Sequence, residues 1–255
     1  MRGVALSSQT VIDDLSKKAK VTLVHAQAEK KNLPFSKGVL LISVGQPAHE
    51  GIKLAATINM VSKQFSSCDV VACDSLQRHT MEIYENLSKE TLYAKANIAG
   101  EEWLKRNDAA LNSFKIPHEI FRWDKYLLDN NFNKCLEKIH LLYKEDKAFA
   151  NAMNETIEAF VERHIQHGHV KDRSKAFNCC FNFLIEECAV IVFMWPNLEY
   201  NYIIYPGKIP KVLEFSLYKF LPPVSSNLLR WLGIYVRTKN RHKKIAVAFQ
   251  EKELA

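Results

Sequence analysis

The chain has 255 residues, 47% of them hydrophobic and 11% aromatic, so it can bury a sizeable core and is not globally disordered. Its length suits one large α/β domain or two small ones. A formal net charge of +7 favours a polyanionic partner such as RNA, DNA or an acidic membrane surface without choosing among them. A soluble protein that is merely basic stays an equal alternative.

The six cysteines indicate a reducing compartment. They show no CxxC pair and no Cys/His spacing suited to zinc, and most stand in or beside apolar runs, where a free thiol behaves as a small hydrophobe. No signal peptide is visible, and the longest apolar stretch, residues 188–195, is too short to span a bilayer. The histidines of residues 163–170 lack a carboxylate or thiol at ligand spacing. We therefore expect a cytoplasmic protein with no membrane segment and no metal.

The first half of the chain predicts a βαβ unit. A short strand is expected near residues 20–26. A buried strand over 37–45, an amphipathic helix over 48–65 and a second apolar strand over 66–75 follow it. Two strands joined by a helix within about forty residues pair in parallel with a right-handed crossover.

Long helices dominate the rest. The sequence predicts a helix over 88–114 with Ser88 as N-cap, and a strand running into a helix over 118–127. A helix with a regular apolar stripe is expected over 147–165, and another, apolar on most of its circumference, over 172–193.

Two further strands are expected, over 199–207 and 243–250. Strands alternating with long helices predict a three-layer α/β fold of Rossmann type with a mainly parallel sheet. We expect residues 1–255 to form one domain, with residues up to about 19 loosely ordered.

Ser43 follows the buried strand directly, in "LLISVGQP". Parallel α/β sheets bind ligands beyond the carboxyl ends of their strands, and Gly45 would let the backbone approach a substrate closely. On spacing alone a structural serine or a helix cap is the stronger interpretation. The stretch matches neither the dinucleotide nor the phosphate-loop pattern, and it is not a GxSxG elbow, so a nucleotide cofactor gains no support.

Glu186 and Glu187 interrupt the apolar helix. Adjacent residues point about 100° apart on a helix, so a helix buried on most sides cannot easily expose both carboxylates. A buried carboxylate needs a cation or hydrogen-bond donors. A substrate ammonium in a pocket and a core Lys or Arg are equally good partners on this reasoning. Tyr205, followed by Pro206, adds a phenol at the end of a later strand.

The chain resembles the tRNA-dependent cyclodipeptide synthases over roughly residues 36–250. The resemblance rests on the order and separations of Ser43, of Phe183 with Glu187 four residues later, and of Tyr205. The resemblance implies a Rossmann-type domain similar to the catalytic domain of class I aminoacyl-tRNA synthetases. It also implies two aminoacyl-tRNAs as substrates, a cyclic dipeptide (2,5-diketopiperazine) as product, and no cofactor.

Two subfamilies are told apart by the residue three after the serine and the residue after the tyrosine. Gln46 and Pro206 make the chain similar to the XYP type. The chain departs from the family at Leu41, where Gly is usual and the first aminoacyl pocket has its floor. It also departs at Phe183, where the usual Tyr carries a hydroxyl.

The resemblance implies ping-pong acyl transfer through aminoacyl-enzyme and dipeptidyl-enzyme intermediates on Ser43. Glu187 is implied to hold the aminoacyl ammonium, and Tyr205 is our candidate proton relay, with Glu187 also possible. Gln46 and the backbone of residues 44–45 are expected to position Ser43 or to stabilise the oxyanion.

A tRNA substrate would account for the positive charge. The family's basic helix corresponds here to residues 88–114, and the densest basic run is 237–244, although a solvated loop is an equal alternative for that run. The candidate tRNA contacts are Lys89, Lys95, Lys105, Arg106, Arg237, Lys239 and Arg241. We expect a monomer. A non-catalytic tRNA- or RNA-binding Rossmann module and another serine acyltransferase or hydrolase remain the alternative functions.

Overall fold

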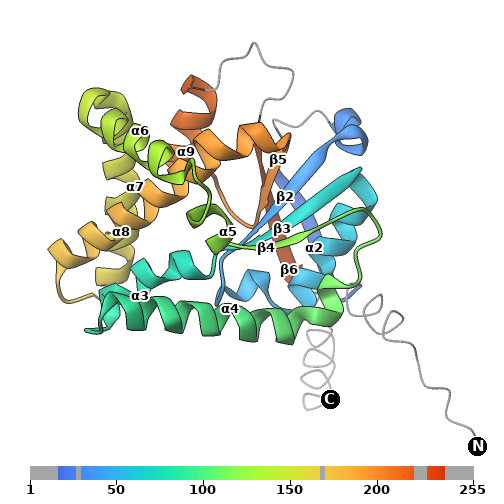
Figure 1. Cartoon of the computed structure of the whole chain (residues 1–255). Helices are drawn as coiled ribbons and strands as arrows, with labels where there is room; N and C mark the ends of the chain where they lie inside the picture. Colours follow the sequence, from blue (N-terminus) through green and yellow to red (C-terminus); the bar gives the residue numbers. More distant parts are fainter. Residues whose placement is uncertain (1–16, 27–29, 167–169, 221–228, 239–255) are drawn as a thin grey trace, which may run out of the picture.

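A six-stranded sheet lies at the centre of the part of the chain that the structure, a computed structural model, describes: residues 17–26, 30–166, 170–220 and 229–238 (Figure 1). Its order is β1-β6-β5-β2-β3-β4. The strands are β1 (Ala19–Ala26), β2 (Lys37–Ile42), β3 (Ser67–Ala72), β4 (Ile120–Arg122), β5 (Tyr202–Tyr205) and β6 (Arg230–Thr238).

Five of these strands run parallel to one another. Only β1, the edge strand, runs antiparallel to its neighbour β6. From β2 the chain continues to β3 and β4 on one side, and later places β5 and β6 on the other. The order of the sheet therefore reverses between β2 and β5. At such a switch point the loops leaving the two strands diverge and open a crevice at their carboxyl ends.

Helices cover both faces of the sheet, which gives the three layers expected (Figure 1). β2 shows why, because Val39 and Leu41 point into one core and Leu40 and Ile42 into the other. The second core contains α2 and α4, and the first contains α6 to α9. The helices are α2 (Gly51–Gln64), α3 (Arg78–Tyr84), α4 (Lys89–Leu111), α5 (Asp124–Leu127), α6 (Phe132–Glu145), α7 (Lys147–Gln166), α8 (Arg173–Cys188) and α9 (Lys211–Phe215).

Short 3-10 and π segments connect these elements. They are η1 (Lys30–Phe35), η2 (Pro47–His49), η3 (Ser75–Gln77), η4 (Ala189–Met194), η5 (Trp195–Leu198) and η6 (Ser216–Phe220). α8 runs directly into η4 and η5, so the apolar helical run is longer than the expected 188–195 stretch. Residues Arg173–Leu198 are long and apolar enough to cross a membrane, but 67% of the apolar window is buried inside the protein. Packing against the sheet accounts for its composition.

The predicted elements within the described residues are confirmed, including the N-cap, where Ser88 Oγ accepts the N–H of Thr91. The strand predicted over 243–250 and nearly all of the N-terminal segment lie outside the described residues. Arg237, the first residue of the basic run 237–244, lies in β6, which continues to Thr238, and residues 239–244 lie outside the described residues.

Strand β6 and helices α3, α6 and α9 were not predicted. The sequence of β6 is an apolar run interrupted by Gly233 and flanked by arginines, which hides the strand pattern. In α6 the apolar positions Phe132, Cys135 and Ile139 recur at helical spacing and face the core, so the signal was there to be read.

Candidate active site

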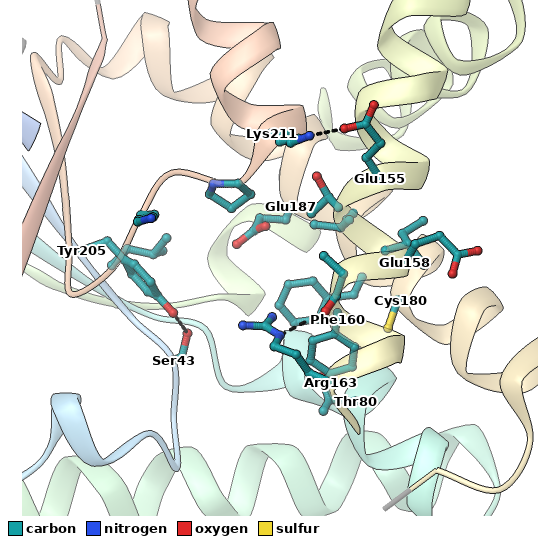
Figure 2. Close-up of a pocket in the computed structure, with 18 of the residues that line it drawn as sticks. Ser43, Thr80, Glu155, Glu158, Phe160, Arg163, Cys180, Glu187, Tyr205 and Lys211 are labelled. Carbon is teal, nitrogen blue, oxygen red and sulfur yellow. Dashed lines mark hydrogen bonds and ion pairs between the residues drawn. The ribbon is translucent and has the colours of Figure 1, made fainter. Parts of the chain in front are cut away.

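Ser43 and Tyr205 meet at the carboxyl ends of two neighbouring strands. Ser43 follows β2, Tyr205 is the last residue of β5, and the register pairs Leu40 with Ile204. The Ser43 hydroxyl oxygen lies 3.2 Å from the Tyr205 hydroxyl oxygen (Figure 2). The two hydroxyl groups are 162 residues apart in sequence, so the switch point of the sheet is what brings them together.

A tight turn follows the serine. The Gln46 N–H donates to the Ser43 carbonyl at 3.2 Å, and Gly45 has a φ of 87°. A β-carbon on Gly45 would meet nothing within 4 Å, so the left-handed backbone and not close packing favours glycine here. Neither Gly45 nor Pro206 is among the residues lining the adjoining cavity, whereas Gln46 is.

A cavity of about 830 Å³ opens beside the two hydroxyl groups. Its wall is largely apolar and comes from the end of β2, from α7 and α8 and from β6. The apolar lining residues include Leu41, Ile157, Phe160, Phe183, Leu184 and Trp231. Leu41 and Phe183, the two departures from the family pattern, therefore both face this cavity. It is large enough for a drug-sized ligand, and an aminoacyl group is smaller.

Glu186 points away from the cavity into a buried polar cluster. Its carboxylate accepts two hydrogen bonds from the Arg78 guanidinium, one from Trp123 Nε1 at 2.8 Å, and lies 3.2 Å from His79 Nε2. Burial alone would raise the pKa of Glu186, but the hydrogen bonds from His79 and Arg78 outweigh it and hold the pKa below its ordinary value. This carboxylate is the core residue with a cationic partner.

Glu187 is the cavity carboxylate. It lines the cavity on α8, four residues after Phe183, and forms no hydrogen bond or ion pair with any residue in the described part of the chain. Figure 2 shows its carboxyl group in the space between Tyr205 and helix α7. Burial raises its pKa to about 7. Of the two interpretations left open for the glutamate pair, a core cationic partner applies to Glu186, and Glu187 is the member of the pair that lines a pocket.

Sequence reasoning missed His49, which is 2% exposed and contacts both hydroxyl-bearing residues. Its Nδ1 lies 2.6 Å from the backbone nitrogen of Ser43, and its ring packs edge-on against the Tyr205 ring at 5.3 Å. No spacing rule marks a histidine at the start of a helix as a partner of a serine six residues earlier. Trp231 was missed with its strand.

The predicted tRNA contacts that the structure describes are all exposed, but some of them pair with carboxylates. All four basic residues of α4 are exposed, but Lys95 pairs with Glu85, and Arg106 pairs with Glu50 and Glu102. Within the described residues Lys89 and Lys105 form no ion pair. Arg237 is exposed on β6, the strand next to the edge strand β1. Lys239 and Arg241 lie outside the described residues.

The six cysteines are buried free thiols, as their apolar surroundings predicted. Among residues 17–26, 30–166, 170–220 and 229–238 no cluster of three or more histidine, cysteine or acidic side chains could hold a metal ion.

No family model and no curated protein matches the sequence. The structure is similar to that of a cyclodipeptide synthase from Fluoribacter dumoffii, with 33% identity, a TM-score of 0.81, and 87% of this chain and 99% of that chain covered. It is also similar to a cyclodipeptide synthase from Candidatus Glomeribacter gigasporarum bound to Phe-tRNAPhe, with 20% identity, a TM-score of 0.64, and 81% and 89% covered.

Tyrosyl-tRNA synthetase from Archaeoglobus fulgidus shares the fold at 10% identity, with a TM-score of 0.51 and 91% of this chain and 64% of that chain covered. The expected relation to class I aminoacyl-tRNA synthetases is confirmed at the level of the fold. Identity of 33% over nearly the whole of the Fluoribacter enzyme goes further than fold. This chain belongs to the cyclodipeptide synthases, which are tRNA-dependent aminoacyltransferases.

Proposed function

We propose that this enzyme makes a cyclic dipeptide from two aminoacyl-tRNAs by a ping-pong reaction through esters of Ser43. One observation carries the proposal: the Ser43 and Tyr205 hydroxyl oxygens lie 3.2 Å apart beside a cavity whose wall holds the carboxyl group of Glu187, which has no partner among the residues that the structure describes. A nucleophile, a proton relay and an ammonium holder are the three groups that such a transfer requires.

In the first step Ser43 Oγ attacks the carbonyl carbon of the first aminoacyl-tRNA. The Oγ–C bond forms, the bond to the ribose oxygen breaks, and the serine proton passes through the Tyr205 hydroxyl to the leaving ribose oxygen. Burial raises the pKa of Tyr205, so the phenol stays protonated and relays a proton without acting as a standing base. The substrate ester is already activated, which explains why a histidine-based triad is not needed.

Glu187 holds the ammonium of the aminoacyl group. The charge-assisted contact stabilises ionised Glu187 and fixes the acyl group for the next step. The pKa of about 7 that Glu187 has without substrate also suits this carboxylate to take a proton from that ammonium. The amine so released attacks the ester of the second aminoacyl-tRNA, giving a dipeptide on Ser43 and the second free tRNA. The terminal ammonium loses one proton to solvent, and the resulting amine attacks the carbonyl carbon of the Ser43 ester. The C–N bond forms, the C–Oγ bond breaks, and the second amine proton passes through the Tyr205 hydroxyl to Ser43 Oγ, which closes the ring and frees the serine.

We assign the enzyme to the XYP subfamily, because Gln46 stands three residues after Ser43 and Pro206 follows Tyr205. Lys89 and Lys105 are the residues of α4 whose charges are left for tRNA phosphates, since Lys95 and Arg106 have carboxylate partners.

Expression in bacteria with mass spectrometry of the medium tests the reaction, and the mass of the product identifies the two amino acids. Wild type should release a cyclic dipeptide, and Ser43→Ala should release none. The control is Ser62→Ala on α2, outside the cavity lining, which should behave as wild type. Equal product from wild type and Ser43→Ala would overturn the proposal.

Trapping separates this reaction from another serine acyltransferase or a hydrolase. Purified enzyme given one labelled aminoacyl-tRNA should retain the label on Ser43 until the second substrate arrives. Rapid release of free amino acid from that ester, with no cyclic product when the second substrate is added, would instead show a hydrolase.

A further inference from the structure

His49 is a buried imidazole that the proposed reaction does not use. It ends η2, six residues after Ser43, and its main-chain carbonyl accepts the Trp103 Nε1–H at 2.9 Å. Burial lowers its pKa to about 4, so the ring is neutral and carries a single N–H. The position of that proton determines what the ring can do.

The hydrogen bonds fix the proton on Nε2. The Nδ1 atom lies 2.6 Å from the backbone nitrogen of Ser43 and 3.1 Å from the Ser43 carbonyl oxygen. A backbone N–H can only donate, and the shorter contact is to that N–H, so Nδ1 accepts. The Nε2 atom is buried without a hydrogen-bond partner among the described residues. An apolar side chain would avoid burying that group, so the contact of Nδ1 with Ser43 is what the imidazole supplies.

This contact bears on the nucleophile in two ways. It holds the backbone of Ser43 and thus the direction of the bond from Cα to Cβ, while the ring edge packs against Tyr205 at 5.3 Å and an interplanar angle of 78°. It also occupies the Ser43 N–H. The Ser43 N–H is therefore not available as a donor to the developing oxyanion.

We propose that His49 is a positioning residue: its Nδ1 anchors the Ser43 amide and its ring abuts Tyr205, so that the two hydroxyl groups are aligned before the aminoacyl-tRNA binds. The inference rests on the proposed role of Ser43. It adds a residue that neither touches substrate nor takes a proton, and whose effect is measured at the acylation of Ser43.

The test compares His49→Asn with His49→Leu. These side chains are close in size and shape, but the Asn Oδ1 can replace Nδ1 as acceptor and Leu cannot. The rate of single-turnover acylation of Ser43 by one labelled aminoacyl-tRNA should fall about 100-fold in His49→Leu and by less than about fivefold in His49→Asn, because small misplacement of a nucleophile costs about that much. Binding of the same aminoacyl-tRNA, measured in a Ser43→Ala background, should be equal in both.

Equal acylation rates in folded His49→Asn and His49→Leu would overturn the proposal. Should both variants fail to fold, nitrogen NMR of wild-type enzyme labelled at histidine decides. The proposal requires a neutral His49 with the proton on Nε2, and a proton on Nδ1 would contradict it. Absence of any label on Ser43 in wild type would instead count against the proposed function.

Discussion

Helix α8 presents two adjacent carboxylates to opposite environments. Glu186 faces Arg78, His79 and Trp123 and has its pKa lowered. Glu187 faces the cavity, has no hydrogen-bond or ion-pair partner among the described residues, and has its pKa raised to about 7. The two residues are neighbours of the same type on one helix, so the helix sequence alone does not distinguish them. Hydrogen bonds satisfy the Glu186 carboxylate within the protein, whereas the proposed function gives Glu187 a substrate ammonium as its partner.

The largest effect is expected at Glu186. Replacing it with Ala removes the carboxylate that neutralises Arg78 and accepts the Trp123 N–H in the buried cluster, which should lower the free energy of unfolding by about 3–5 kcal/mol. Urea denaturation measures the loss. The control is Glu162→Ala, which breaks an exposed pair with Arg173 and should cost less than about 1 kcal/mol. Equal losses in the two variants would contradict the comparison.

The next effect is a pH dependence that belongs to Glu187. Its pKa is raised on folding from 4.5 to about 7, so the folded protein holds a proton that the unfolded chain releases. Below pH 4.5 both states are protonated and nothing is lost. As the pH rises from 4.5 to above 7, the free energy of unfolding of wild type falls by up to about 3 kcal/mol, whereas that of Glu187→Gln does not fall for this reason. Urea unfolding at pH 5 and pH 8 should show that the difference in free energy of unfolding between the two proteins is larger at pH 8. A difference that does not change with pH would show that Glu187 is exposed to water.

The catalytic consequence is smaller in free energy. Glu187→Gln should fold normally and lose about 10- to 100-fold in cyclic dipeptide formation, because a charged contact with the substrate ammonium is worth about 1.5–3 kcal/mol. Glu155→Gln is the matched control, since Glu155 also lines the cavity but is paired with Lys211. Full activity in Glu187→Gln would remove that residue from ammonium binding.

The smallest effect is expected from Phe183→Tyr, one turn before Glu187. The ring is only partly buried and lines a cavity of about 830 Å³, so an added hydroxyl has room. Product formation should stay within about threefold of wild type, less than about 1 kcal/mol. Aggregation of the variant, followed by light scattering, would show instead that the wall is tightly packed here.

Local pattern was enough to place most strands and helices, and to put Ser43 and Tyr205 at strand ends, because apolar periodicity and chain punctuation are local properties. The interrupted apolar helix singled out the pair Glu186 and Glu187, and the family pattern selected Glu187 from it. The apolar spacing of α6 is a local pattern of the same kind, so this helix could also have been predicted.

What the sequence by itself determined is the set of reactive groups and the kind of fold that carries them. The tertiary structure decided how they are used. The pairing of β2 with β5 set Ser43 against Tyr205, the Arg78 cluster drew Glu186 inward and left Glu187 to the cavity, and burial made His49 a neutral acceptor for the Ser43 amide. Each of these depends on partners six to 162 residues away in the chain. Burial and hydrogen bonding are properties of those partners, so no local pattern contains them.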